Sequence, residues 1–152
     1  MNNNSIIKKI IIYNYIYNNI NYKKENFLSD ITLSINTITR QRPFYLFNKK
    51  GEVIGSKTTL LNKNLKSFLY KFKRYTLIKL YSTSIFYKSI YNFDSNFNLD
   101  ICLNSKSYFF EYFNYSNLGY MYKFNIKFIF NKNISNIVKL DYVLNILNFK
   151  LI

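Results

Sequence analysis

The chain has 152 residues, of which 49% are hydrophobic and 20% aromatic. That is enough apolar material for one domain spanning residues 1–152 with a real core. Lysine and arginine number 22 against 7 aspartates and glutamates, a formal net charge of +15, and there is one cysteine and no histidine. This composition excludes intrinsic disorder, an internal disulfide and a cysteine metal cluster. No run of apolar residues is long enough to predict a membrane span.

The positive charge predicts a polyanionic partner. A folded domain with this excess repels itself unless an anion neutralises it, and RNA is the commonest such partner, followed by an anionic membrane surface. Solubility alone is the competing explanation, but designed small domains need only about 2–8 net charges for that purpose.

The abundance of Asn, Ile, Lys, Tyr and Phe and the absence of Ala are typical of an AT-rich genome. Organelle genomes are the first candidates, and we expect a mitochondrial protein. The start, Met1-Asn2-Asn3-Asn4, lacks the arginines and amphipathic pattern of an import signal, as expected for a protein made inside the organelle.

The first third of the chain predicts a strand, a helix and a hairpin. Residues Ile6–Tyr17 are β-branched and aromatic, which is typical of a mostly buried strand. In Lys23–Thr39, apolar residues at helical spacing predict an amphipathic helix: Phe27, Leu28, Ile31, Ile35 and Ile38. Pro43 ends this helix. Two predicted strands, Phe44–Phe47 and Val53–Leu61, follow, joined by a turn at Asn48-Lys49-Lys50-Gly51 whose tip carries two lysines.

A second helix is predicted from another apolar stripe, formed by Leu65, Phe68, Leu69, Phe72 and Leu80, which Tyr75 and Leu77 fit less regularly. A basic group falls toward another face: Lys63, Lys66, Tyr70, Lys73 and Arg74. Residues Ser82–Asn98 show no clean period. Leu99–Leu103 is a short predicted strand, and Tyr108–Phe113 is an apolar patch.

The last part of the chain alternates and then becomes helical. Phe124, Ile126, Phe128 and Phe130 alternate with Lys123, Asn125 and Lys127, which predicts a half-buried strand with a basic open face. Ser135 is a candidate cap for a helix over Asn136–Leu147, with Ile137, Leu140, Leu144 and Leu147 facing inward.

Reactive groups are scarce, so we expect no enzyme, no metal and no cofactor. Histidine is absent, the seven acidic residues are scattered, and no glycine-rich phosphate loop is present. Cys102 lacks a histidine to activate it and is interpreted as a small core residue.

Three stretches, in order, resemble the large-subunit ribosomal protein family L-five. Ile38-Thr39-Arg40-Gln41-Arg42-Pro43 is similar to the family's helix-ending I-T-G-Q-K/R-P, with arginine in place of the glycine. Ile54-Gly55-Ser56-Lys57-Thr58-Thr59-Leu60 resembles its I-G-x-K-V-T-L, although Leu61-Asn62 replaces the Arg-Gly that usually follows. Ile126-Lys127-Phe128-Ile129-Phe130 with a closing helix resembles its last strand and helix. The strand containing Lys8-Lys9-Ile10-Ile11 stands at the right distance upstream.

The resemblance implies an α+β domain, an antiparallel sheet with helices packed on one face. It also implies a place in the central protuberance of the large ribosomal subunit, on large-subunit rRNA and neighbouring ribosomal proteins. Family members commonly contact 5S rRNA, lie near the peptidyl-site tRNA and bridge to a small-subunit protein. Three further features depart from the family: its first helix has no counterpart before the opening strand, the loop between Pro43 and Ile54 is shorter, and its F-D-G-R-G-N-Y loop is matched at best by Asn92-Phe93-Asp94.

The expected role is therefore a structural, RNA-binding component of the mitochondrial ribosome. The candidate RNA-binding residues are Arg40, Arg42, Lys49, Lys50, Lys57, Lys63, Lys66, Lys73 and Arg74. A basic peripheral subunit of an organellar membrane complex is the alternative. A homing endonuclease is a third possibility, which the missing acidic catalytic motif disfavours.

Overall fold

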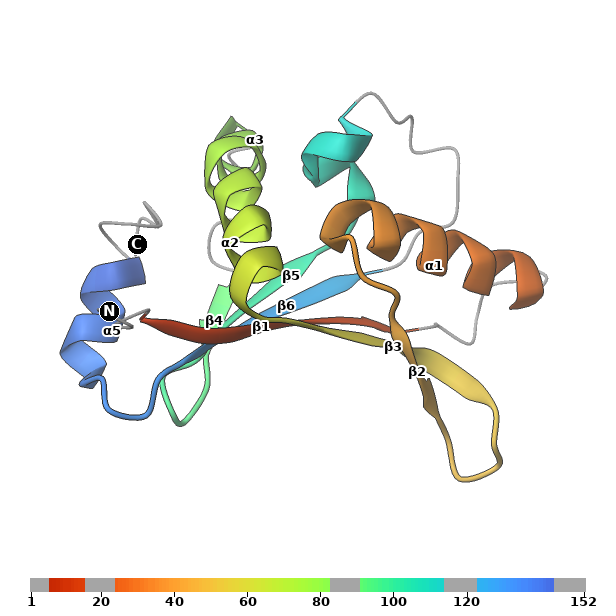
Figure 1. Ribbon diagram of the computed structural model, residues 1–152, viewed down its shortest axis with the longest axis horizontal. Coiled ribbons are helices and arrows are strands. Elements are labelled where there is room, and N and C mark those ends of the chain that lie inside the picture. Colours follow the sequence, from red (N-terminus) through yellow and green to blue (C-terminus); the bar gives the residue numbers. More distant parts are fainter. Residues whose placement is uncertain (1–5, 16–23, 83–90, 114–122, 144–152) are drawn as a thin grey trace.

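The computed structural model describes residues 6–15, 24–82, 91–113 and 123–143 and has an α+β fold built on a six-stranded antiparallel sheet (Figure 1). The strands are β1 (Ile7–Tyr15), β2 (Phe44–Phe47), β3 (Val53–Leu60), β4 (Tyr91–Phe93), β5 (Leu99–Leu103) and β6 (Phe124–Phe130), in the order β2-β3-β1-β6-β5-β4. The described helices are α1 (Lys24–Thr39), α2 (Asn62–Lys71), α3 (Leu77–Ser82) and α5 (Asn136–Asp141), and a π-helical turn, η1 (Phe72–Thr76), joins α2 to α3. The predicted fold class is confirmed.

Strand β1 lies in the middle of the sheet, paired with β3 on one side and β6 on the other. Its isoleucines suit this position because β-branched side chains pack well on a pleated, buried surface. Ile10 and Ile12 are fully buried toward the core, and Ile11, on the opposite face, is only 5% exposed. The predicted strand is therefore confirmed over Ile7–Tyr15 and is mostly buried, and its last two predicted residues, 16 and 17, lie outside the described residues.

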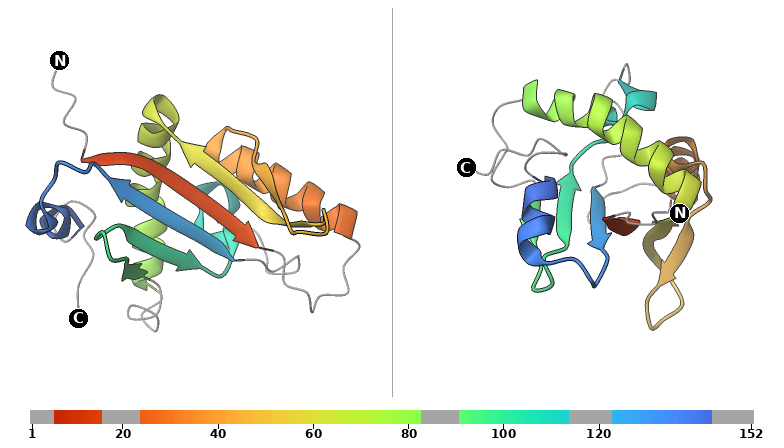
Figure 2. Two further views of the ribbon diagram at one scale, coloured as in Figure 1. Left: turned by 90° about the horizontal axis from the view of Figure 1, so that it is seen from below. Right: turned by 60° about the vertical axis from the view of Figure 1, so that its left-hand side comes forward.

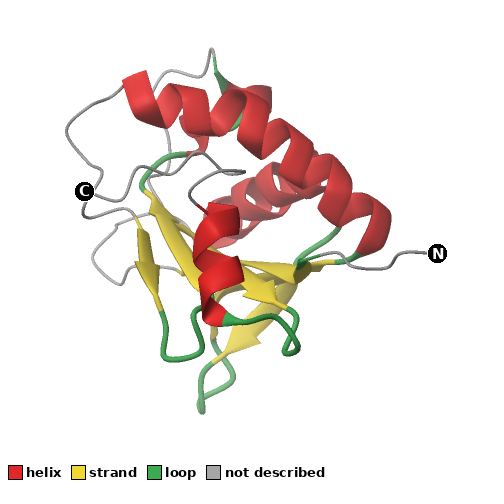
Figure 3. Ribbon diagram, turned by 90° about the vertical axis from the view of Figure 1, so that its left-hand side faces the viewer, coloured by secondary structure: helices red, strands yellow, loops and turns green. Residues whose placement is uncertain are grey.

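Helices α1, α2 and α3 cover one face of the sheet, as predicted (Figure 1), and Figure 3 shows this helical layer above the strands. Helix α1 turns Ile31, Ile35 and Ile38 into the core, as its spacing predicted. From the second helical segment, Phe72 packs on Phe128 of β6 with ring centroids 5.5 Å apart. No described helix covers the other face of the sheet (Figure 1).

The second predicted helix is interrupted by the π-helical turn η1. A π-helical turn inserts one residue into the repeat, so the inward positions shift along the chain. Phe72 and Leu77 are both buried although Leu77 is five positions after Phe72. This shift explains why Leu77 fitted the apolar stripe irregularly.

Two segments without a clear sequence pattern have short regular structure. Residues Tyr91–Phe93, within the unassigned stretch, form the edge strand β4 and pair with β5. The apolar patch at Tyr108–Phe113 belongs to two 3₁₀ turns, η2 (Lys106–Tyr108) and η3 (Phe110–Tyr112). Between them, Phe109 is 2% exposed and packs edge-on against Phe124.

Helix α5 begins where predicted, but it packs through a different face. Ser135 accepts the Lys139 N–H through its main-chain oxygen, and its side chain makes no capping hydrogen bond, so the predicted side-chain cap was wrong. Ile137 was predicted to face inward and is 79% exposed. The inward position is taken instead by Lys139, whose Nζ donates to the main-chain oxygen of Asn96 at 3.0 Å, and by residues after Asp141. Leu140 is half-buried, and predicted residues 144 and 147 lie outside the described residues.

Candidate nucleic-acid interface

The sheet face opposite the helices carries aromatic, basic and amide side chains in register across five strands. Residues paired directly across antiparallel strands project to the same face. The pairing aligns one row formed by Phe44, Lys57, Tyr13, Asn125 and Cys102. Figure 2 (left) looks at this side, with the strands in front of the helices. We call it the open sheet face.

Two tyrosines and a lysine lie close together on the open sheet face. The Tyr13 and Tyr15 rings are 6.1 Å apart between centroids and nearly parallel, at 9°. The Lys57 ammonium lies 5.8 Å from the centre of the Tyr13 ring. Flat rings can stack on unpaired bases, and a neighbouring ammonium can meet a phosphate, so the arrangement suits single-stranded RNA.

An ion pair lies next to this group on the same face. Lys127 pairs across the strands with Ile11 and Asp100, and its Nζ is 3.2 Å from a carboxylate oxygen of Asp94. Burial by itself lowers the pKa of Lys127, but the hydrogen bond to Asp94 and the charge of Asp100 outweigh it and raise that pKa. Lys127 therefore stays charged and is partly neutralised by its own neighbours.

The pKa values of Asp94 and Asp100 are shifted in opposite directions. Burial tends to raise the pKa of Asp94, yet hydrogen bonds from Asn98, Lys127 and Asn96 overcome it and lower that pKa. The pKa of Asp100 is raised, mainly by burial, because the opposing charge of Lys127 compensates only in part. The carboxylate of Asp94 thus orders the loop between β4 and β5.

A basic stripe runs along the outer surface of α2 and η1. Lys63, Lys66, Tyr70 and Arg74 are all exposed and follow one another at intervals of three or four residues, so they share one side of the helix. The Arg74 guanidinium donates to the Tyr70 hydroxyl at 3.1 Å and lies 5.7 Å from the ring centre. This stripe presents three cations and an aromatic ring to solvent.

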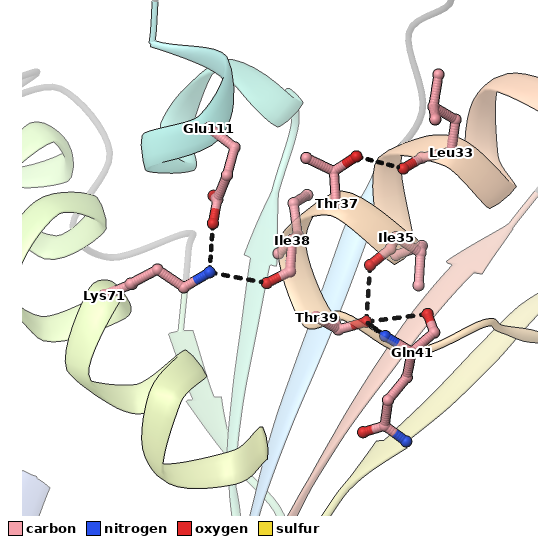
Figure 4. A network of polar contacts seen from close by, with 8 residues as sticks. All are labelled: Leu33, Ile35, Thr37, Ile38, Thr39, Gln41, Lys71 and Glu111. Atoms are coloured by element: carbon pink, nitrogen blue, oxygen red, sulfur yellow. Dashed lines mark hydrogen bonds and ion pairs between the residues drawn. The ribbon is translucent and has the colours of Figure 1, made fainter. Parts of the chain in front are cut away.

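The segment Thr39–Arg42 is a helix cap that projects two arginines. Thr39 Oγ1 donates to the main-chain oxygen of Ile35 at 2.7 Å and accepts from the Gln41 N–H at 3.2 Å (Figure 4). Gln41 Nε2 donates to the Thr59 carbonyl at 3.3 Å. Because this network holds the main chain, the side chains of Arg40 and Arg42 stay exposed. Arg40 has the left-handed φ of 59°, which is where the resembled motif has glycine.

The ammonium of Lys71 binds the carboxyl end of α1 beside this cap. Lys71 Nζ donates to the main-chain oxygen of Ile38 at 3.2 Å and forms an ion pair with Glu111 (Figure 4). A positive charge at a helix carboxyl end is favourable because the helix dipole is negative there. Lys71 therefore acts within the fold and joins α1, α2 and η3.

The β2–β3 hairpin presents Lys49 and Lys50 on a fixed turn. Asn48 Oδ1 accepts the main-chain N–H groups of Lys50 and Glu52 at 2.9 and 3.0 Å. Gly51 supplies the left-handed φ of 79° that the turn needs. Both lysines are exposed at the tip, as the sequence predicted.

Lys73 differs from the other predicted RNA-binding residues. It is half-buried, and its Nζ lies 5.6 Å from the centre of the Tyr142 ring. Burial lowers the pKa of Lys73. Arg74, in the same π-helical turn, instead contacts Tyr70 of the stripe. The position of Lys73 therefore fits a contact between η1 and the end of α5.

The nine predicted residues thus fall into separate groups. Lys63, Lys66 and Arg74 share the helix stripe, Arg40 and Arg42 the cap, and Lys49 and Lys50 the hairpin tip. Lys57 stands apart on the open sheet face, and Lys73 lies beside Tyr142.

Sequence reasoning did not select Tyr13, Tyr15 or Phe44, which lie around Lys57. The alternation of aromatic side chains at Tyr13 and Tyr15 was the available signal, but the preceding run of isoleucines concealed which face each residue would take.

Potential metal ligands do not gather at one place among the described residues. Within them, no three cysteine or acidic side chains come close enough to hold a metal ion. Cys102 is half-buried on the open sheet face between the buried Ile101 and Leu103, so its interpretation as a core residue was wrong. It takes the outward position because strand β5 alternates.

None of the described helices is both long and apolar enough to cross a membrane.

Comparison with known proteins supports the fold. No protein-family model and no curated protein sequence matches this chain. Among solved structures it is similar to Mth689, a DUF54 protein from Methanothermobacter thermautotrophicus, with 17% sequence identity and a TM-score of 0.53. The similarity covers 93% of this chain and 98% of that one. At this identity the likeness concerns the arrangement of the elements.

Proposed function

We propose that this chain is an RNA-binding structural protein of the large subunit of a mitochondrial ribosome, as its resemblance to the L-five family implies. Its role is to screen phosphate repulsion so that rRNA helices and neighbouring proteins of the central protuberance can pack together. No catalytic step is part of this proposal.

The observation that carries the proposal is the tyrosine pair on the open sheet face with Lys57 beside it. No described helix covers this face (Figure 2), and single-stranded RNA is commonly held by aromatic rings and cations on such a surface. The row continues through Phe44, which is 79% exposed. An anionic membrane would also attract the positive charge, but parallel tyrosine rings fit bases better than acyl chains.

The charge distribution supports a large RNA over a small anion. Three ion pairs among the described residues occupy Lys71, Lys106 and Lys127. The predicted cations of the helix stripe, the cap and the hairpin tip lie on different parts of the surface and remain exposed. Contacts in several directions are typical of a ribosomal protein embedded in rRNA.

Sedimentation tests the proposal. A tagged copy expressed in its organelle should sediment with large ribosomal subunits and leave them as the salt concentration rises, because phosphate contacts release counterions. Imaging of that particle should place the chain on rRNA, and contacts with 5S rRNA, tRNA or a small-subunit protein would be visible there. Recovery in salt-washed membranes, with none in ribosome fractions, would favour a membrane-complex subunit and overturn the proposal.

A further inference from the structure

Strand β2 lies at one end of the sheet, so among the described residues no strand pairs with its outer edge. Figure 1 shows the β2–β3 hairpin projecting away from the helical layer. A free edge carries main-chain N–H and C=O groups that can pair with another strand, and proteins usually guard it with charged side chains or proline. The four residues of β2, Phe44-Tyr45-Leu46-Phe47, include neither. This edge is therefore available for a further strand.

The main-chain groups of Tyr45 and Phe47 point to this outer edge. The Asn48 N–H donates across the hairpin at 2.9 Å, so the main chain of Asn48 faces the β3 side. Alternate residues of an antiparallel strand turn their main-chain groups to the same side, and the register shift in this pair adds a residue to β3 while β2 stays regular. Leu46 and Phe44 therefore also face β3, and the N–H and C=O groups of Tyr45 and Phe47 face outward.

Exposed aromatic rings flank this edge on both faces of the sheet. Tyr45 points toward the helices, because its hydroxyl hydrogen-bonds with that of Thr32 in α1. Phe47 lies on the same face as Tyr45 and is 62% exposed, whereas Phe44 lies on the open sheet face and is 79% exposed. A strand added beside β2 would place its alternate side chains against both phenylalanine rings.

The charges around β2 favour an acidic partner. Arg42 lies before the strand and Lys49 after it, and both are exposed. A second copy of this chain is disfavoured because each copy carries a net charge of +15. A nucleic acid would also be attracted by these cations, but its backbone has no N–H donors to pair with the outward carbonyls. An extended acidic peptide supplies both the main-chain groups and the negative charge.

We propose that the outer edge of β2 binds an extended, acidic segment of another protein, which joins the sheet as a further strand. The main chain of this segment pairs with Tyr45 and Phe47, its alternate side chains contact Phe44 and Phe47, and its carboxylates lie near Arg42 and Lys49. The inference goes beyond the proposed function and does not depend on it, since the edge needs neither RNA nor a ribosome to bind a peptide.

Hydrogen exchange measured by NMR on the purified full chain tests the site residue by residue. The probe is an octapeptide with a Val-Thr-Val-Thr centre between pairs of glutamates. In the free chain, the amides of Tyr45 and Phe47 should exchange much faster than that of Leu46. Saturating peptide should slow the exchange of both amides roughly tenfold or more, because a paired amide exchanges only when the pairing opens. Exchange left unchanged by the peptide would overturn the proposal.

Two altered peptides separate strand pairing from charge attraction. N-methylation of the central peptide nitrogens keeps the charge but removes the N–H donors, so it should abolish the protection. Glutamine in place of the glutamates should weaken binding by about threefold or more, because several exposed ion pairs are lost. Equal protection by the methylated peptide would mean charge attraction alone, and equal affinity of the glutamine peptide would mean that the partner need not be acidic. Either result would overturn the proposal.

A matched pair of variants tests the edge itself. Phe47→Pro removes the outward N–H, whereas Phe47→Thr removes the same ring and keeps that N–H. The proline variant should bind the peptide roughly tenfold more weakly than the threonine variant, because a peptide carbonyl is left unpaired. Equal affinities would contradict pairing at Phe47. If the proline variant does not fold, the methylated peptide makes the same comparison on the unaltered chain.

A single-stranded uridine oligonucleotide is the last probe. It should leave the amides of Tyr45 and Phe47 unprotected, because RNA offers no strand to pair with them. Protection of these amides by the oligonucleotide and not by the peptide would assign the edge to RNA and overturn the protein partner.

Discussion

The main-chain oxygen of Asn14 in β1 approaches Gly55 in β3 so closely that a Cβ on the glycine would lie 2.2 Å from it. Asn14 pairs with Ser56, the residue after Gly55. The buried side-chain amide of Asn14 also donates to the Lys123 carbonyl at 3.2 Å. Gly55 is the glycine of the Ile54-Gly55-Ser56-Lys57 stretch that resembles the L-five family. In this fold its role is to let β1 and β3 approach each other.

Replacing Gly55 with alanine should therefore destabilise the protein by about 2–4 kcal/mol, because strand backbone must move to admit the methyl group. Urea denaturation followed by circular dichroism measures this loss. Gly51→Ala is the matched control: its Cβ would meet nothing within 4 Å, so only the positive φ should cost about 1 kcal/mol. Equal effects of the two substitutions would contradict the close approach.

At Arg40 the backbone adopts a left-handed conformation that disfavours a residue with a Cβ. Its left-handed φ costs a residue with a Cβ about 1–2 kcal/mol, offset in part by the greater chain entropy that glycine has when unfolded. Arg40→Gly should therefore raise the free energy of unfolding by about 0.5–1 kcal/mol. Arg40→Ala keeps the Cβ and removes the same charge, so it should bring no such gain. A stabilisation shared by both variants would point to charge repulsion.

The ion pair between Asp94 and Lys127 predicts that the free energy of unfolding depends on pH. Because the folded protein lowers the pKa of Asp94, the carboxylate stabilises the fold fully above its ordinary pKa. That contribution is lost as the pH falls through the lowered folded-state value. Asp94→Asn should thus cost stability at neutral pH, and the difference from the original chain should shrink on acidification. Denaturation series between neutral and strongly acidic pH measure this difference, and a constant difference would exclude the carboxylate as its cause.

The sequence predicted the elements whose periodicity is simple. In β6, strict alternation identified both the buried phenylalanines and the outward Lys127. In β1, three consecutive isoleucines are buried, so composition could not tell the core face from the face carrying Tyr13. That distinction depends on the pairing with β3 and β6, which is set by residues far along the chain.

The misplaced side chains have local physical causes. Lys73 was assigned to the basic face of the second helix from that helix alone, but its ammonium lies 5.6 Å from the ring centre of Tyr142, far along the chain. Ile137 was assigned inward because apolar residues usually are, but the Asn96 carbonyl makes a buried position acceptable for Lys139. Neither partner could be identified from the spacing of residues within one helix.

The tyrosine pair on the open sheet face gives the sharpest test of how RNA is bound. Tyr13→Thr keeps a residue suited to a strand but removes the ring, and it should weaken binding of a single-stranded RNA by roughly fivefold to hundredfold, since one base stack is worth about 1–3 kcal/mol. Tyr13→Phe keeps the ring and should bind nearly as well as the original chain. Fluorescence anisotropy with a labelled oligonucleotide measures both. If threonine and phenylalanine were equivalent, the open sheet face would not bind bases through Tyr13.

The hairpin tip tests the electrostatic part of the interface. Lys49 and Lys50 are exposed and their turn is held by Asn48, so converting both to glutamate should leave the fold intact. If each lysine neutralises one phosphate, the slope of log affinity against log salt should become shallower by about 1.4 for single-stranded RNA. Ribosome association should weaken in parallel. Lys49→Gln/Lys50→Gln serves as the neutral control: it should change the slope by the same amount but weaken binding less, because it adds no repulsion. An unchanged slope together with normal incorporation into large subunits would remove the hairpin tip from the interface.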